Sequence, residues 1–184
     1  IASYSEQLLD WLDRYTFPAE SKYNDAAYAE RSASDFLDGL ISAGTTTAMV
    51  YVTSHAGATD IFFEAAAERR MRMIAGKVLM DQQAPAELCD ETEGGINDSA
   101  SLIEKWHGKD RLGYAVTPRF AISSSSAQLS AAGRLHRKYP STWIQTHLSE
   151  NQAEIHKVAE LHPSSLDYLD VYERHGLLTE RTVF

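Results

Sequence analysis

The sequence predicts an α/β protein in which parallel strands alternate with helices, and three observations lead to this prediction. Apolar, β-branched runs alternate with segments whose apolar residues recur at helical spacing. Several apolar runs lack polar alternation, as expected for strands covered on both faces. No Gly-x-Gly-x-x-Gly or Gly-x-x-x-x-Gly-Lys follows any run, which disfavours a nucleotide-binding open sheet. A doubly wound sheet and a partial (β/α)8 TIM-type barrel both fit, and four strands with the edge of a fifth would form about half a barrel.

Two helices and two strands are predicted in the first half of the chain. Residues 24–43 carry apolar side chains at helical spacing, and Gly44 supplies a stop. The run TTTAMVYVT is β-branched and apolar, which predicts a buried strand over residues 45–53. Residues 59–70 are predicted to form a helix, and residues 71–80 a strand.

A loop with Pro85 and the pair Gly94-Gly95 is expected to lead into the second half of the chain. Ser125 and Gln128 predict a capping box at the start of the helix that follows the third strand. The remaining predicted elements, in chain order, are a helix over 98–107, a strand over 112–120, a helix over 123–139, a strand over 143–147, helices over 151–161 and 165–175, and the start of a strand at 182–184.

The 184 residues are expected to form one incomplete domain, 1–184, of a longer chain, because the sequence opens at Ile1 without Met and ends on the apolar run TVF. The net charge of -9, with no basic stripe, argues against a nucleic-acid partner. No apolar run approaches the ~20 residues that span a bilayer, so no membrane partner is expected. The single cysteine, Cys89, is interpreted as a free thiol and favours a reducing, cytoplasmic location.

Polar residues at the ends of the predicted strands are the candidates for chemistry, since parallel α/β proteins place their sites there. His147 ends the fourth strand, where a neutral imidazole would suit zinc or iron. Glu150 follows three residues later and could carry a proton from a metal-bound water to a leaving amine. The alternative is a satisfied, partly buried His147, with Glu150 in the first turn of a helix.

Arg119 and Phe120 end the third strand. Arg119 could present its guanidinium to a carbonyl or carboxylate, and Phe120 could stack on a flat ring. The alternative is a surface ion pair beside a core aromatic. His55 is a further ligand candidate, whereas Asp81 and Gln82 could line a pocket or cap a loop. The other histidines are expected at the surface: His107, His136, His156, His162 and His175.

Five segments resemble guanine deaminases, within the metal-dependent amidohydrolase superfamily: GTTTAMV, GKVLMDQQAP, AVTPRFAISSS, WIQTHLSENQAEI and YLDVYERHGLL. The resemblance runs in order over essentially all of the chain. TPRF and THLSEN together are fairly specific, whereas GTTT is shared widely across the superfamily. The resemblance implies a (β/α)8 barrel, of which this chain would hold the second to fifth strands and the start of the sixth. It also implies hydrolytic deamination of guanine to xanthine and ammonia.

The resemblance further implies a role for each candidate residue. His147 matches the metal-ligand histidine on the fifth barrel strand. Glu150 matches the proton-shuttling glutamate, which also contacts the purine. Arg119 and Phe120 match the substrate-binding pair, with the arginine on the guanine carbonyl oxygen. Together the four residues would form the substrate-binding set.

The resemblance places the remaining metal ligands before Ile1 and beyond Phe184. The implied cofactor is one divalent metal, zinc by preference or iron, in the intact protein. The fragment alone is therefore expected to be inactive. The intact protein is expected to be a homodimer, as family members commonly are.

Two other functions stay open at this point. One is a related amidohydrolase that acts on another aminated or chlorinated heterocycle, such as a triazine. The other is a catalytically dead α/β module that is complete as given.

Overall fold

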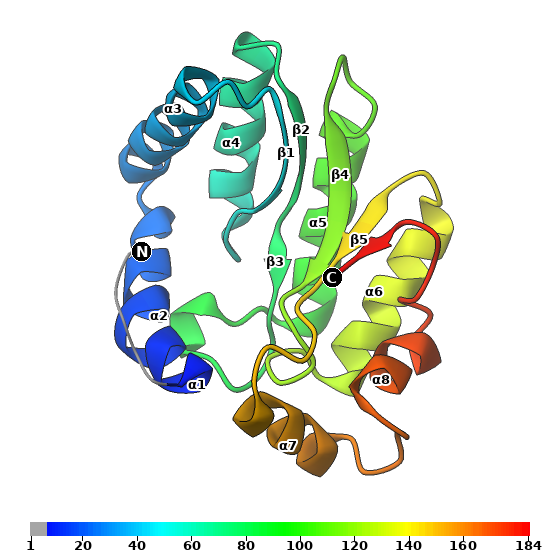
Figure 1. Cartoon of the computed structure of the whole chain (residues 1–184). Helices are drawn as coiled ribbons and strands as arrows, with labels where there is room; N and C mark the ends of the chain where they lie inside the picture. Colours follow the sequence, from blue (N-terminus) through cyan, green and yellow to red (C-terminus); the bar gives the residue numbers. More distant parts are fainter. Residues whose placement is uncertain (1–6) are drawn as a thin grey trace.

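Parallel strands follow one another across the sheet in the order of the sequence (Figure 1). Five form the path β1-β2-β4-β5-β6, and β3 also pairs with β4. A sequential order without reversal is that of a barrel, because a doubly wound sheet reverses its order at a switch point. The computed structural model, which describes residues 7–184, therefore has the predicted half-barrel. The strands are β1 Thr47–Tyr51, β2 Arg72–Gly76, β3 Val78–Leu79, β4 Gly113–Pro118, β5 Trp143–Gln145 and β6 Thr182–Val183.

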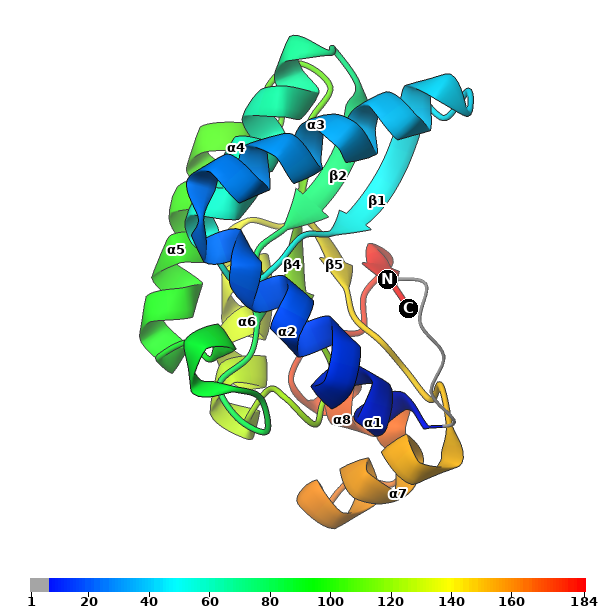
Figure 2. The same ribbon diagram turned by 90° about the vertical axis from the view of Figure 1, so that its left-hand side faces the viewer.

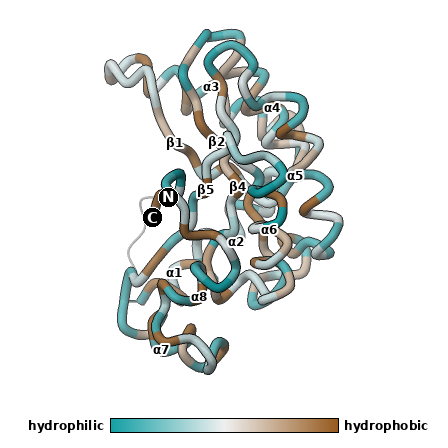
Figure 3. The backbone as a smooth tube through the Cα atoms, turned by 90° about the vertical axis from the view of Figure 1, so that its right-hand side faces the viewer, coloured by the Kyte–Doolittle hydropathy of each residue, from teal (hydrophilic) through white to brown (hydrophobic). Residues whose placement is uncertain are grey.

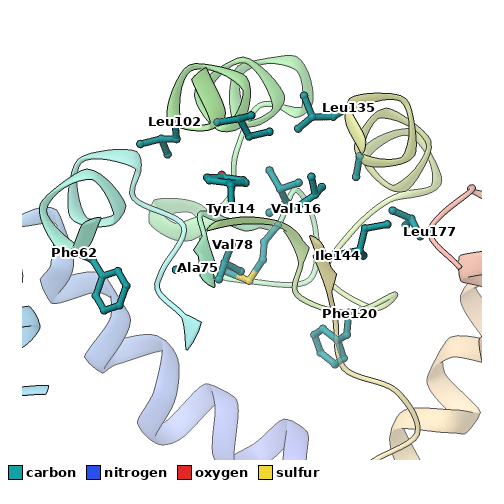
Figure 4. Packing of buried hydrophobic residues seen from close by; sticks show 14 of the residues in the cluster. Phe62, Ala75, Val78, Leu102, Tyr114, Val116, Phe120, Leu135, Ile144 and Leu177 are labelled. Atoms are coloured by element: carbon teal, nitrogen blue, oxygen red, sulfur yellow. The ribbon is translucent and has the colours of Figure 1, made fainter. Parts of the chain in front are cut away.

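Helices α4, α5 and α6 cover one face of these strands (Figures 1 and 4). A run of short helices, from α1 to η2, lies near the carboxyl ends of β1 and β2 (Figure 2). The helical segments are α1 Leu8–Trp11, η1 Leu12–Thr16, α2 Phe17–Glu20, η2 Ser21–Asn24, α3 Ala26–Ser42, α4 Ala56–Glu68, η3 Ala86–Leu88, α5 Thr92–Trp106, α6 Ser126–Lys138, α7 Gln152–Leu161 and α8 Tyr168–Arg174.

The core lies between β4 and the helices behind it. All six residues of β4 are buried, as its lack of polar alternation predicts. Buried Leu102 on α5 and Leu135 on α6 lie in the helix layer next to buried Tyr114 and Val116 on β4 (Figure 4). Hydrophobic stretches run along the strands, whereas the outer turns of α4 and α5 carry hydrophilic ones (Figure 3). Full burial of each such apolar side chain contributes roughly 1.5–3 kcal/mol, so this layer holds the carboxyl ends of the strands in place.

Helix α5 begins at Thr92, so the prediction that Gly94-Gly95 belongs to a loop is wrong. The Glu91 carboxylate caps the helix by accepting from the Gly94 N–H at 2.9 Å. A Cβ on Gly95 would lie 2.6 Å from the Asp90 carboxyl group. Glycine therefore lets the first turn of α5 approach the Asp90 side chain closely, and this need outweighs its poor helix propensity.

The strand predicted over residues 71–80 is divided into β2 and β3 at Lys77. The Lys77 side chain is 1% exposed, and its Nζ lies 2.5 Å from Asp90 Oδ1. A Cβ on Gly76 would lie 1.8 Å from the Ala115 carbonyl oxygen, so only glycine fits there. The close approach of β2 to β4 and the buried ion pair explain why the strand does not continue unbroken.

The predicted capping box at Ser125 is only half present. Ser125 Oγ accepts from the Gln128 N–H at 3.1 Å, but neither polar atom of the Gln128 side chain has a partner in the described part of the chain. A complete capping box occurs instead at Asn151 and Glu154, at the start of α7.

The prediction of surface histidines is wrong for His136 and His162, which are buried.

Candidate active site

A pocket at the carboxyl ends of β4 and β5 brings together all four site residues that the sequence predicts. Its other walls come from the short helices at residues 8–16, to which the sequence analysis assigned no element. The lining residues are Leu8, Trp11, Leu12, Arg119, Phe120, His147 and Glu150. Adjacent parallel strands thus place residues 119–120 and 147–150 side by side, as their positions at strand ends predict.

His147 follows β5 and is held from several sides. Its Nδ1 lies 2.8 Å from the Arg119 carbonyl oxygen. Because a carbonyl oxygen only accepts, Nδ1 carries the hydrogen and donates the hydrogen bond. The His147 carbonyl accepts from the Tyr172 hydroxyl at 2.8 Å. The Tyr51 ring packs on the imidazole, with centroids 4.4 Å apart. The bond from Nδ1 selects the tautomer whose lone pair is on Nε2, and Nε2 makes no hydrogen bond within the described residues.

Glu150 places its carboxylate beside that free nitrogen. Its Oε1 lies 3.8 Å from His147 Nε2, and its side chain is 42% exposed. Ser149 has a positive φ of 57°, which turns the chain sharply before Glu150. Glu150 precedes Asn151, the N-cap of α7, so the alternative that places Glu150 in the first helical turn is wrong.

Glu154 anchors the backbone of Glu150, and sequence reasoning missed it. The Glu154 carboxylate is buried and accepts from the Glu150 N–H at 2.6 Å and the Asn151 N–H at 3.3 Å. The Tyr168 hydroxyl donates to it at 2.8 Å. Burial raises the pKa of Tyr168, so this hydroxyl stays protonated and remains a donor. The spacing from Asn151 to Glu154 was the available signal, because it is that of a capping box.

Arg119 is buried rather than at the surface, so the surface ion pair offered as an alternative is wrong. The residue is 9% exposed, and its Nη1 donates to Glu20 Oε1 at 2.7 Å. The guanidinium carbon lies 5.4 Å from the centre of the Phe17 ring. Phe120 is 3% exposed and belongs to the core while it also lines the pocket, so the two interpretations of Phe120 are compatible.

His55, the further ligand candidate, is held by its neighbours outside this pocket. It precedes α4, and its Nδ1 lies 3.0 Å from Thr53 Oγ1. Burial lowers the pKa of His55, followed by the effect of the nearby Lys77 charge. His147 lines the pocket described above, whereas His55 is not among its lining residues.

Asp81 and Gln82 bind backbone and hydroxyl groups rather than line this pocket. Asp81 accepts from the Ser125 N–H at 2.7 Å and from Ser125 Oγ at 2.6 Å, at the start of α6. Gln82 Nε2 donates to the Ile122 carbonyl at 2.9 Å.

Cys89 is half-buried, and burial raises the pKa of its thiol. A thiol with a raised pKa is a poor nucleophile at neutral pH, as expected for an unreactive free cysteine.

Among residues 7–184, no group of three or more His, Cys, Asp and Glu side chains is arranged to hold a metal ion. His147 offers one free donor atom, whereas catalytic zinc usually takes three protein ligands. His147 therefore suits one ligand position, and further ligands would have to lie outside the described residues.

Residues 2–184 match the Amidohydrolase family. The chain belongs to this family. It is 48% identical over 184 residues to the guanine deaminase of Escherichia coli (strain K12), which covers 100% of this chain and 42% of that protein. It is 33% identical over 179 residues to the guanine deaminase of Homo sapiens, which covers 96% of this chain and 39% of that protein. The resemblance to guanine deaminases is thus confirmed, and the chain spans about two-fifths of the length of these relatives.

Solved structures give the same relationship. The E. coli guanine deaminase structure superposes with a TM-score of 0.98 and covers 100% of this chain and 43% of that one, at 48% identity. A guanine deaminase from C. acetobutylicum, with guanine bound in its active site, gives a TM-score of 0.93 at 33% identity over 97% of this chain and 43% of that one. The atrazine chlorohydrolase TrzN from Arthrobacter aurescens gives 0.83 at 15% identity, over 96% of this chain and 42% of that one, which shows a shared fold alone.

Proposed function

We propose that the intact protein containing this chain hydrolyses guanine to xanthine and ammonia. The observation that carries the proposal is the free Nε2 of His147 facing the Glu150 carboxylate, in a pocket also lined by Arg119 and Phe120. The identity of 48% to the E. coli guanine deaminase supports guanine as the substrate. The activity belongs to the whole protein, because a half-barrel carries only part of the site.

His147 would hold a divalent metal through Nε2, together with ligands from outside the described residues. We expect zinc by preference, or iron. When bound, such an ion supplies the Lewis acidity that lowers the pKa of a water molecule to about 7. The hydrogen bond from Nδ1 to the Arg119 carbonyl fixes the tautomer that this role needs.

Glu150 would move the proton. Its carboxylate takes a proton from the attacking water, whose oxygen bonds to the amine-bearing carbon of guanine. Glu150 then gives the proton to the amino nitrogen as the C–N bond breaks and ammonia leaves. The Glu154 carboxylate accepts from the Glu150 N–H and so would hold the Glu150 backbone, and with it the Glu150 side chain, in position during turnover.

Arg119 and Phe120 would bind and orient the purine. The guanidinium has N–H groups beyond the one that donates to Glu20, and these can donate to the guanine carbonyl oxygen. Phe120 would pack against the purine ring. Such orientation lowers the barrier by removing the entropy cost of aligning the reactants.

A substrate panel on the purified full-length protein tests this function. Xanthine and ammonia should form from guanine in a 1:1 ratio, with far slower reaction of adenine, adenosine and an amino- or chlorotriazine. Faster turnover of a triazine would favour the related heterocycle hydrolase instead. No turnover of any of them by the metal-loaded protein would favour a catalytically dead module.

The location and assembly of the protein stay predictions. No helix in residues 7–184 is long and apolar enough to cross a membrane. We propose a cytoplasmic homodimer that takes a small purine and binds neither nucleic acid nor a membrane. Size-exclusion chromatography with light scattering on the full-length protein measures the oligomeric state.

A further inference from the structure

Arg119 depends on a segment of the chain that lies far away in the sequence. Glu20 is 99 residues before Arg119, and its Oε1 lies 2.7 Å from Arg119 Nη1. Both side chains are largely buried, with exposed fractions of 11% for Arg119 and 15% for Glu20. Because a buried charge is costly unless it is paired, each of these two groups requires the other.

The same helical turn gives Arg119 a second contact. Phe17 and Glu20 begin and end α2 and lie three residues apart, so their side chains share one face of the helix. The Phe17 ring lies 5.4 Å from the guanidinium carbon, while Glu20 binds one of its nitrogens. The α2 turn thus holds the guanidinium by both a ring and a carboxylate.

The ion pair engages one nitrogen of Arg119 and leaves the others for a ligand. A guanidinium has five N–H donors, and among residues 7–184 the side-chain hydrogen bond of Arg119 uses Nη1. Arg119 lines the pocket with His147 and Glu150, whereas Glu20 is not among its lining residues and borders a neighbouring cavity together with Arg119 and His147. Glu20 therefore acts on the pocket through Arg119.

The Glu20 oxygen that does not face Arg119 has little other compensation. Oε2 of Glu20 is a buried atom without a hydrogen-bond partner in the described part of the chain. Because both side chains are largely buried, water screens the attraction between the Glu20 carboxylate and the Arg119 guanidinium only weakly. The positive charge of Arg119 is thus offset by a carboxylate oxygen 2.7 Å away.

We infer that Glu20 is a positioning residue that aims Arg119 at the substrate and offsets its charge, so that the pocket prefers a neutral carbonyl to an anion. An unpaired arginine attracts anions, whereas a paired one still donates hydrogen bonds with less net charge. Guanine is a neutral carbonyl compound at neutral pH, so this preference would suit it. The inference rests on the proposed function, since it takes the purine carbonyl as the ligand of Arg119.

The test compares Glu20→Gln with the unchanged full-length, metal-loaded protein. Glutamine keeps the shape and an acceptor oxygen but removes the charge. We expect KM for guanine to rise about tenfold, and the inhibition constant of anionic urate to fall about tenfold relative to that of neutral hypoxanthine. Glu20→Asp, which restores the charge, should return the ratio of the two inhibition constants toward that of the unchanged protein.

Glu87→Gln is the matched control. Glu87 is exposed, and its Oε1 lies 3.4 Å from the hydroxyl of Ser21, the residue after Glu20. The change therefore removes a charge from the same region without touching Arg119. It should leave both inhibition constants unchanged. Comparison of melting temperatures identifies any variant that fails to fold.

The outcomes separate this inference from the proposed function. If the unchanged protein does not deaminate guanine, the proposed function fails. If it does, but folded Glu20→Gln keeps the inhibition ratio of the unchanged protein, Glu20 has no role in charge selection and the inference is overturned. A lower melting temperature with unaltered KM and inhibition constants would show a structural role only, which also overturns the inference.

Discussion

At the residue scale, single hydrogen bonds determine how each candidate group could act. The His147 Nδ1–H donates a hydrogen bond to the Arg119 carbonyl, and this points Nε2 toward Glu150. Strand-end positions in the sequence predicted that Arg119, Phe120, His147 and Glu150 would lie together, because neighbouring parallel strands end at the same edge. The partners of these groups could not be predicted in this way, since Glu20 lies 99 residues from Arg119 and no local pattern links them.

Replacement of Arg119 by lysine should weaken guanine binding without removing catalysis. Lysine keeps a positive charge near Glu20 but lacks the planar fork that serves a carboxylate and a carbonyl together. Alanine is less informative, because it would leave the Glu20 charge buried and unpaired. We expect KM to rise by about tenfold or more, the factor for ~1.4 kcal/mol, with a smaller change in kcat. Steady-state kinetics on guanine measure both values, and unchanged kinetics would rule out the contact.

Loss of the Tyr168 hydroxyl should loosen the loop that carries Glu150. Tyr168→Phe removes one donor to the buried Glu154 carboxylate, which also holds the Glu150 N–H. We expect the free energy of unfolding to fall by about 1–3 kcal/mol, the usual cost of leaving a buried polar group unsatisfied, and kcat to fall as well. Urea denaturation measures the first effect and turnover the second. If neither changes, Glu154 does not anchor the loop.

At the scale of elements, the sequence predicted the segments whose side chains follow one period. Apolar β-branched residues identified β1, helical spacing identified α3, and the Ser125 cap identified the start of α6. The run from Leu8 to Tyr23 received no assignment, since it divides into α, π and 3-10 turns with Pro18 inside. Tertiary contacts outweighed local propensity at Gly94-Gly95, where the start of α5 packs against Asp90.

Removal of Asp90 should destabilise the junction between β2, β3 and α5. Asp90→Asn leaves the Lys77 ammonium, which is 1% exposed, without its counter-charge. We expect a loss of about 3–5 kcal/mol in the free energy of unfolding, because an uncompensated buried charge is costly. Denaturant unfolding measures the loss, and Glu91→Gln, at the adjacent exposed cap, serves as the control. A loss below 1 kcal/mol would show that water reaches Lys77.

The buried His136 on α6 should make stability depend on pH. Burial lowers the pKa of His136, with smaller effects from Arg181 and Arg137. The unfolded chain therefore binds a proton more readily, and stability is lost as the pH falls below the unfolded value of about 6.5. Urea unfolding at pH 7.5 and 5.5 should give a smaller difference for His136→Gln than for the unchanged protein. An identical difference would assign the pH dependence to other groups.

At the scale of the whole molecule, the sheet has two unpaired edge strands in the described part of the chain, β1 and β6. In residues 7–184, β1 pairs with β2 and β6 pairs with β5, and neither strand has a second neighbour. Val183 and Phe184, in and directly after β6, are exposed at the β6 edge. A chain that spans about two-fifths of its relatives thus has half of their barrel, and an open edge is a hazard for aggregation.

The isolated 184-residue chain should consequently behave differently from the full-length protein. We expect it to aggregate or to melt without cooperativity, whereas the full-length protein should melt in a cooperative transition. Light scattering and thermal denaturation of the two chains distinguish these behaviours. A monodisperse and cooperative isolated chain would support the complete α/β module instead.

The most direct test of the central claim is a comparison of guanine turnover and metal content between the full-length protein and its Glu150→Gln variant. We predict that the unchanged protein produces xanthine and that the variant loses about 10²–10⁴-fold in kcat, the usual contribution of a general acid–base, while its metal content stays the same. Glutamine keeps the size of the side chain but does not carry the proton. Turnover by the folded variant at the rate of the unchanged protein would contradict the role of Glu150, and metal-loaded unchanged protein that forms no xanthine would contradict the proposed activity itself.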